Sequence, residues 1–350
     1  MILVTGGTGL LGSHLLYHLV LRGEKVRAIK RRSSNLDAVR RVFSYYHDSP
    51  GELLYKIEWV DADILDVESL MEAMHGVRHV YHSAAWVSFD RRDRESLISN
   101  NVAGTRNIIN ACLVKSVTKL CHVSSTSSLG SADPDGFIHE NSIWETDGYH
   151  TGYSVSKFES ELQVWKGIEE GLKTIIVNPS VILGPGFWNK GSSSMFPAIY
   201  RGFNFYTQGV TGYISVEDVS RAMITLMNSH HSGDRYILSS ENLSYKQVFD
   251  MIADAMGKKR PFVEATPFLA EMACHFSKVR ELIGGKPLIT REMAISSRNK
   301  SYFSNEKFSR KFNVRFQPVE ETIRNICGHF KRDLEEGWLD KKAKLWFQPE

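Results

Sequence analysis

The sequence has 350 residues, with 43 lysines and arginines against 40 aspartates and glutamates, and a formal net charge of +3. A net charge this small gives no reason to expect a nucleic-acid partner, and no apolar run reaches the roughly 18 residues of a membrane span. The four cysteines are scattered and lack CxxC pairs, which is typical of reduced packing residues in a cytoplasmic protein. The length suggests one large domain or two interlocked ones.

The chain opens with a short apolar stretch, residues 2–4, which predicts a buried strand, and a helix is expected over residues 10–21. Between them lies a turn with the spacing Gly6-x-x-Gly9-x-x-Gly12. This spacing is one residue longer than the commonest dinucleotide fingerprint, and no Gly-Lys-Ser/Thr follows as in a Walker loop. The free amides of such a turn and the dipole of the helix behind it favour a bound phosphate.

The first half of the chain alternates apolar, strand-like runs with amphipathic helical stretches such as residues 67–75 and 96–115. This alternation predicts a doubly wound parallel sheet with right-handed crossovers. Ligands of such sheets bind beyond the carboxyl ends of the strands, so the residues after each strand are the candidates for a site. The further strands are expected at residues 25–30, 57–60, 78–83, 119–124 and 174–178.

A basic cluster, Lys30, Arg31 and Arg32, follows the second strand at the place where an NAD-binding unit carries an acid for the ribose 2′-hydroxyl. Basic residues here suit the additional 2′-phosphate of NADP, because guanidinium groups bind phosphate in a bidentate manner. The alternative is an ordinary solvated run of charge. We favour the phosphate interpretation and expect NADP(H) to be preferred over NAD(H).

Small and polar residues follow the third and fourth strands. Asp63 and Ile64 could bond the amino group of an adenine and pack on its ring. The alternative for Asp63 is to cap the next helix, a role that Asp66 fills better. We expect His82 to be a packing or hydrogen-bonded histidine and expect no metal, because no second histidine or carboxylate stands at metal-ligand spacing from it. The cofactor's ribose and phosphates would lie against the small residues that come next, Ser83, Ala84 and Ala85.

Two later segments carry residues suited to proton transfer. A run of hydroxyl residues, 124–128, leaves the fifth strand, and Tyr153 and Lys157 follow four residues apart, so on a helix they share one face. A free tyrosine has a pKa of about 10, and a lysine ammonium one turn away would lower that pKa by favouring the phenolate. Together with the glycine turn, the pair predicts general acid/base chemistry.

These segments together resemble the extended short-chain dehydrogenase/reductase superfamily, also called the NAD-dependent epimerase/dehydratase family. The resemblance covers nearly the whole chain and runs in order through residues 5–12, 63–64, 84–85, 100–105, 124–125, 153–157, 178–180, 184–186 and 213–219. It implies that Tyr153 is the general acid/base, that Lys157 holds the nicotinamide ribose and that Ser125 orients the substrate oxygen. Asn101 would steady the helix behind the site. Cofactor contacts are expected from Gly6, Thr8, Gly9, Leu10, Leu11, Gly12, Lys30, Arg31, Arg32, Asp63, Ile64, Ser83, Ala84, Ala85, Ser124, Asn178, Pro179 and Val181.

Two departures from family patterns narrow the choice of branch. Ser127 and Ser128 stand where sugar-nucleotide 4,6-dehydratases carry an Asp-Glu pair, and residues 211–216 lack the arginine and histidine of nucleotide-sugar epimerases. What remains is similar to the dihydroflavonol reductase and 3β-hydroxysteroid dehydrogenase branches. The expected function is therefore NADP(H)-dependent reduction of a ketone or aldehyde of a small, fairly apolar substrate, or oxidation of the matching alcohol. The alternatives are a nucleotide-sugar epimerase with transient oxidation and, less favoured, a non-catalytic NAD(P)-sensing protein.

We expect a Rossmann-type domain at residues 1–179 plus 213–239, and a smaller, mostly helical substrate-binding cap at residues 180–212 plus 240–350. Aromatic residues crowd the segment after the sixth strand and suggest an apolar pocket wall, although each of them alone is more typical of core. Because the corresponding helices pair two subunits in many relatives, a homodimer is expected. The predicted pocket residues are Trp86, Phe89, Trp188, Met195 and Phe196.

Overall fold

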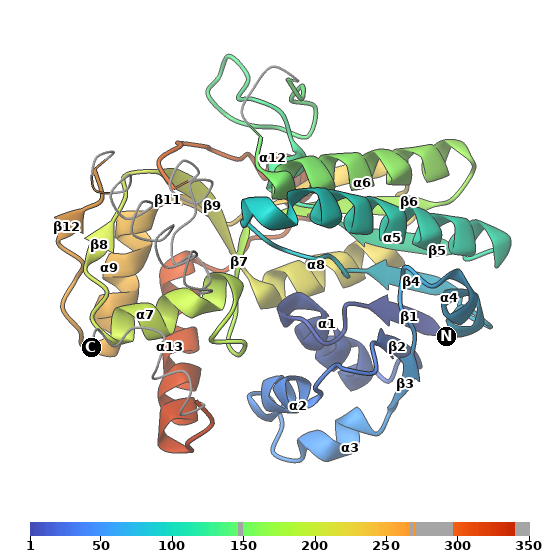
Figure 1. Cartoon of the computed structure of the whole chain (residues 1–350), viewed down its shortest axis with the longest axis horizontal. Coiled ribbons are helices and arrows are strands. Elements are labelled where there is room, and N and C mark those ends of the chain that lie inside the picture. Colours follow the sequence, from blue (N-terminus) through green and yellow to red (C-terminus); the bar gives the residue numbers. More distant parts are fainter. Residues whose placement is uncertain (146–149, 267–268, 270–296, 340–350) are drawn as a thin grey trace.

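A seven-stranded parallel sheet forms the centre of the computed structural model, which describes residues 1–145, 150–266, 269 and 297–339 (Figure 1). The strand order is β10-β6-β5-β4-β1-β2-β3, so the order reverses between β1 and β4. The predicted Rossmann-type α/β fold is confirmed. The strands are β1 (Ile2–Thr5), β2 (Val26–Lys30), β3 (Ile57–Asp61), β4 (His79–His82), β5 (Lys119–Val123), β6 (Thr174–Pro179) and β10 (Asp234–Leu238).

Helices cover both faces of this sheet because successive strand residues point to opposite sides. In β1, Ile2 and Val4 belong to one core cluster, whereas Leu3 lies between them in the sequence and belongs to a second cluster. The first cluster includes residues of α1 (Leu10–Leu21), α2 (Asp37–Ser44), α3 (Pro50–Leu54) and α8 (Val216–Asn228). The second includes residues of α4 (Val67–Ala73), α5 (Arg94–Val114) and α6 (Gly152–Glu169).

A smaller lobe begins where β6 ends and lies on the left in Figure 1. Its three-stranded sheet has the order β11-β9-β7, with β9 parallel to β7 and antiparallel to β11. Its elements are β7 (Val181–Leu183), α7 (Met195–Tyr200), β8 (Phe205–Tyr206), β9 (Val210–Ser215), β11 (Glu241–Ser244), α9 (Tyr245–Met256), β12 (Val263–Glu264) and α13 (Val319–Glu335).

The predicted division into two domains stays a prediction. Within the segment expected to form the cap, α12 (Glu306–Phe312) packs against β10 and places Phe308 in the core of the main sheet. Other parts of that segment, residues 267–268, 270–296 and 340–350, lie outside the described residues, and so does Cys274. The three cysteines that are described, Cys112, Cys121 and Cys327, are buried and unpaired. Over the described ranges, no helix combines the length and apolarity needed to cross a membrane.

A buried carboxylate joins the small lobe to the main sheet. Asp333, in the last turn of α13, is fully buried and accepts hydrogen bonds from side chains of three separate residues. The Arg41 Nε of α2 lies 2.8 Å away, and Tyr45 Oη and Trp188 Nε1 each lie 2.6 Å away. Glu336 forms a second ion pair with Arg41, and its side chain is 43% exposed. These contacts fix α13 against α2.

Candidate active site

The turn between β1 and α1 lies where the strand order reverses, which is where ligands of doubly wound sheets bind. Gly6 has a φ of +70°, and a Cβ there would lie 2.7 Å from the backbone nitrogen of Ala84. A Cβ on Gly12 would lie 2.1 Å from the carbonyl oxygen of Gly6. Gly9 precedes α1 without a side-chain cap. The first turn of α1 therefore has amide groups that can donate to a phosphate.

The residues after β4 lie directly against this turn. The Ser83 hydroxyl donates to the Thr5 carbonyl over 2.7 Å, and the Ala84 amide donates to Thr5 Oγ1 over 3.2 Å. His82 bonds through Nδ1 to Thr5 Oγ1 at 2.8 Å and through Nε2 to Thr105 Oγ1 at 3.2 Å. Burial lowers the pKa of His82 to about 3, so the ring is neutral. Its two hydrogen bonds agree with the packing or hydrogen-bonding role predicted from the sequence.

The predicted adenine-binding residues Asp63 and Ile64 form a tight loop against α5. Asp63 Oδ1 accepts from the amide of Leu65, and Asn107 donates to the carbonyl of Ile64 over 2.9 Å. A Cβ on Gly104 would lie 2.5 Å from the Ile64 side chain. The helix cap is Asp66, which accepts from the Glu68 amide, as expected. Sequence reasoning missed Asn107, whose only signal is its position three residues after Gly104 on one helix.

The three basic residues after β2 differ from one another in their surroundings. The Lys30 ammonium forms an ion pair with Asp61 on the neighbouring strand β3. Arg31 and Arg32 are exposed. Lys30 thus has a carboxylate partner within the protein, and its predicted contact with a 2′-phosphate stays a prediction, as do those of the two arginines. The two arginines remain the side chains best placed to reach an anion in solvent.

Tyr153 and Lys157 lie in the first two turns of α6. This helix begins after Thr151, whose side chain accepts a hydrogen bond from the Ser154 amide. The Tyr153 hydroxyl lies beside the side chain of Ser125, and Lys157 Nζ donates to the carbonyl of Val123 over 3.0 Å. Both partners lie at the carboxyl end of β5. The structure thus brings the predicted catalytic serine, tyrosine and lysine together.

Burial shifts the pKa of both ionisable groups away from their usual values. It raises the pKa of Tyr153, and the side chain of Ser125 opposes that rise. It lowers the pKa of Lys157 to about 8, while the negative charge of Glu161 acts in the opposite direction. At neutral pH the lysine is therefore mostly an ammonium ion. A cation held one turn from the phenol stabilises the phenolate that a proton transfer creates.

Asn101 joins the loop after β4 to the helix that carries the tyrosine. Its Oδ1 accepts from the Trp86 amide over 2.8 Å, and its Nδ2 donates to the Trp86 carbonyl over 2.9 Å and to Ser156 Oγ over 3.1 Å. The side chain thus contacts α6 through the hydroxyl of Ser156. Asn101 is thus placed to steady α6, which is the role that the resemblance implies.

Four residues predicted to contact the cofactor are buried or pack against a hydrophobic core. Ser124 and Asn178 are buried, and their side chains donate to the carboxylate of Glu161, a residue that sequence reasoning missed. Pro179 is buried at the end of β6, and Val181 packs against the core of the small lobe. The side chains of Ser124 and Asn178 therefore hold the loop, and the cofactor contacts predicted for these four residues stay predictions.

The predicted pocket residues separate into two groups. Trp188 and Phe196 are buried in the core of the small lobe, with Met195 packed against that core. Trp188 and Phe196 are packing residues, because the Trp188 ring donates to Asp333 and its faces contact other aromatic rings. Trp86 is 39% exposed, and the Phe89 ring centroid lies 5.8 Å from that of Tyr153. Of the five predicted pocket residues, Phe89 is the one whose ring contacts Tyr153, and the pocket roles of Trp86 and of the partly buried Met195 stay predictions.

Residues 2–238 match the sequence model of a known family, described as the NAD dependent epimerase/dehydratase family. The chain belongs to this family. It is an NAD(P)-dependent oxidoreductase of the extended short-chain dehydrogenase/reductase type. The match covers the whole main sheet, including the glycine turn and the Tyr153–Lys157 pair.

Two relatives and one solved structure are similar to this chain over most of its length. It is 30% identical over 275 residues to sterol demethylase protein B of Methylococcus capsulatus, covering 77% of this chain and 78% of the relative. It is 26% identical over 338 residues to a putative dihydroflavonol 4-reductase of Synechocystis sp., covering 94% of each. The crystal structure of gox2253 superposes with a TM-score of 0.77 at 26% identity, covering 95% of this chain and 98% of that one.

Proposed function

We propose that the protein is an NADP(H)-dependent oxidoreductase that interconverts a carbonyl group and an alcohol on a small, fairly apolar molecule. The observation that carries this proposal is that Ser125, Tyr153 and the Lys157 ammonium lie together at the carboxyl edge of the sheet, with Lys157 one helical turn from Tyr153. The homodimer expected from the sequence stays a prediction.

Each of the three residues has a separate part in the proposed reaction. Bound NADPH supplies a hydride to the carbonyl carbon. The Tyr153 hydroxyl donates its proton to the carbonyl oxygen, and the Lys157 ammonium stabilises the phenolate left behind. Ser125 Oγ accepts from both the amide and the hydroxyl of Ser127, which leaves its own proton to donate to the substrate oxygen once substrate lies beside Tyr153. Oxidation of the alcohol reverses these proton movements.

The residues around the glycine turn fit a dinucleotide phosphate. A side chain on Gly6 or Gly12 would collide with backbone, and the N-terminus of α1 has no side-chain cap. The turn therefore keeps its backbone open for an anion. The exposed Arg31 and Arg32 at the end of β2 would bind a 2′-phosphate, which supports NADP(H) as the preferred cofactor.

The double variant Arg31→Glu, Arg32→Glu tests this preference. We expect kcat/KM for NADPH to fall by about 100-fold or more, because each of the two arginines loses a hydrogen bond to a charged group that contributes about 1.5–3 kcal/mol. The value for NADH should change far less. Arg324→Glu, on an exposed residue of α13, is the matched control and should leave both values unchanged. A wild-type protein that already prefers NADH would refute the assignment.

Two serines in the loop after β5, together with the names of two relatives, support a choice of substrate class. Ser127 and Ser128 are neutral and bonded within the loop, so no acid/base pair for elimination stands there. Named relatives include a sterol demethylase protein and a putative dihydroflavonol 4-reductase. Both names point to polycyclic molecules without a nucleotide group. We therefore favour a polycyclic or aryl carbonyl compound over a nucleotide sugar.

A substrate screen tests the proposed function directly. The purified protein is mixed with NADPH and with sterol ketones, aryl ketones, aldehydes and nucleotide sugars in turn, and NADPH absorbance is followed. We expect oxidation of NADPH with an apolar ketone or aldehyde. Turnover of nucleotide sugars alone, without net change in NADPH, would instead establish the epimerase alternative.

A further inference from the structure

Tyr153, Lys157 and Glu161 stand at successive four-residue intervals on α6, so they share one face of the helix. Glu161 is the third of these residues, and its side chain is only 3% exposed. We propose that Glu161 is a positioning residue, whose carboxylate fixes the loop carrying Ser125 and places a negative charge one helical turn from Lys157. This inference rests on the proposed function of the site.

One oxygen of Glu161 faces the catalytic loop. Oε2 accepts from Ser124 Oγ at 2.5 Å and from Asn178 Nδ2 at 2.9 Å, and Ser128 Oγ lies 2.8 Å away. These donors come from the end of β5, from the short helix at Thr126–Ser128 and from β6. A single carboxylate oxygen therefore gathers three separate segments at the carboxyl edge of the sheet.

The same donors also hold the backbone of Ser125. Asn178 Nδ2, which has two protons, lies 3.1 Å from the Ser125 carbonyl oxygen, and Ser128 Oγ lies 2.7 Å from it. Asn178 thus connects the Glu161 carboxylate to the peptide group of Ser125, which lies beside Tyr153. Loss of the carboxylate would free Asn178 and Ser128 to turn, and the Ser125 hydroxyl would lose its fixed position.

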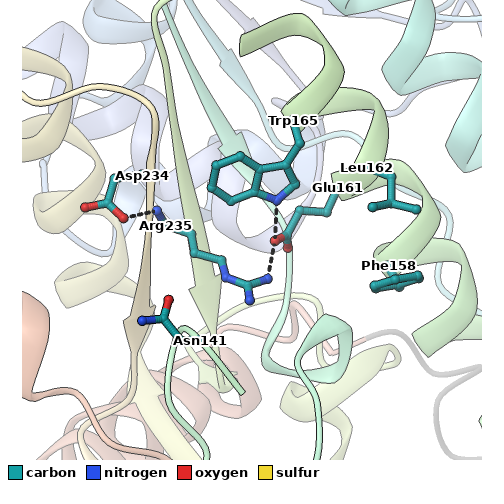
Figure 2. Close-up of a pocket in the computed structure, with 7 residues that line it drawn as sticks. All are labelled: Asn141, Phe158, Glu161, Leu162, Trp165, Asp234 and Arg235. Atoms are coloured by element: carbon teal, nitrogen blue, oxygen red, sulfur yellow. Dashed lines mark hydrogen bonds and ion pairs between the residues drawn. The ribbon is translucent and has the colours of Figure 1, made fainter. Parts of the chain in front are cut away.

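The other oxygen of Glu161 faces outward, toward a pocket of about 320 Å³ (Figure 2). Oε1 accepts from Arg235 Nη1 at 2.8 Å and from Trp165 Nε1 at 3.3 Å. Arg235 Nε in turn donates to the Glu140 carbonyl over 2.6 Å. Figure 2 shows Arg235 and Trp165 converging on this oxygen from β10 and α6. The arginine compensates the buried charge from the solvent side, which a buried carboxylate requires.

On the inner side, the charge of Glu161 acts on Lys157. The groups that face this lysine from other elements are His82 of β4 and His122 of β5, and both are neutral because burial lowers their pKa well below its usual value. On α6 the neighbours are the neutral Tyr153 and the anionic Glu161. The carboxylate is thus the charge that opposes desolvation of the ammonium.

The variant Glu161→Gln separates this role from simple packing, because it keeps the shape and removes the charge. In wild-type enzyme, kcat for carbonyl reduction should fall as pH rises through about 8, where Lys157 loses its proton. In Glu161→Gln we expect this falling limb to move to lower pH by about one unit and kcat at pH 7 to drop about tenfold. The KM for NADPH should stay within about twofold, because the glycine turn is untouched.

Two further variants complete the design. Glu169→Gln removes a carboxylate from the exposed end of the same helix and should leave the pH profile and kcat unchanged. Glu161→Asp keeps the charge but withdraws it from Asn178 and Ser128. In Glu161→Asp we expect the falling limb of the kcat–pH profile to stay near its wild-type position and kcat to be lower. If Glu161→Gln fails to fold, Glu161→Asp still tests the proposal. A Glu161→Asp enzyme with the same kcat as the wild type would overturn it.

A readout without substrate distinguishes failure of this inference from failure of the proposed function. Protein labelled with ¹³C at lysine Cε is titrated by NMR in the presence of NADPH, and Lys157→Arg identifies the Lys157 signal. We expect the titration of Lys157 to move to lower pH in Glu161→Gln. An unmoved titration would overturn the inference, even in an enzyme that reduces carbonyls. An enzyme that reduces no carbonyl but shows the shift would overturn only the proposed function.

Discussion

Tyr153→Phe is expected to lower kcat for carbonyl reduction by about 100-fold or more while leaving NADPH binding intact. The physical reason is that general acid catalysis typically contributes about 10²- to 10⁴-fold, and phenylalanine has no proton to give. The ring itself would still fill the space beside Phe89, whose centroid lies 5.8 Å away. The measurement is the steady-state rate with the best substrate of the screen, together with NADPH affinity from fluorescence quenching.

Tyr55→Phe provides the control for this prediction, because Tyr55 is 92% exposed and distant in the sequence from the site. It should retain wild-type kcat. A Tyr153→Phe enzyme that kept more than about a tenth of its turnover would show that another group protonates the substrate. In that case the contact between Tyr153 and Ser125 would have only a structural role.

Asp333→Ala is expected to lower the free energy of unfolding by about 3–5 kcal/mol, which is typical when one partner of a buried ion pair is removed. Arg41 is 7% exposed, and among the described residues its remaining ion-pair partner would be Glu336, whose side chain is 43% exposed. The donors on Tyr45 and Trp188 would also lose their acceptor. Equilibrium unfolding in urea, followed by tryptophan fluorescence and circular dichroism, measures the change.

The matched control for this second prediction is Asp254→Ala. Asp254 also pairs with an arginine, Arg260, but the two side chains are 51% and 60% exposed. Surface pairs of this kind contribute at most about 1 kcal/mol, so the control should unfold within that range of the wild type. Equal losses of unfolding free energy in the two variants would mean that the burial of Asp333 does not determine its contribution to stability.

Sequence reasoning reached the features that depend on local pattern. The alternation of apolar and amphipathic runs predicts the parallel sheet, because strands and crossover helices differ in the spacing of their apolar residues. Tyr153 and Lys157 could be paired because four residues on a helix return to the same face. Asp66 could be recognised as a cap because its role needs only the next two residues.

The features that it missed depend on contacts between distant segments. Trp188 and Phe196 have the composition of a pocket wall, but Asp333 and the ring of Phe330 come from a helix far along the chain. Nothing local distinguishes a buried Glu161 from an exposed one. Its partners lie in or just after three different strands, β5, β6 and β10, and at Trp165 on its own helix. Likewise, Lys30 is neutralised by Asp61 only because β2 and β3 pair in that register.

The position of Asp333 also has a consequence for biosynthesis. Arg41 and Asp333 are 292 positions apart, so a ribosome makes the whole main sheet before it makes this carboxylate. During that interval Arg41 has no anion in α13 to pair with, and the indole of Trp188 has no acceptor there. The two lobes therefore reach their final arrangement only after α13 has left the exit tunnel. A nascent chain that ends at β10 would present this surface of α2 to chaperones.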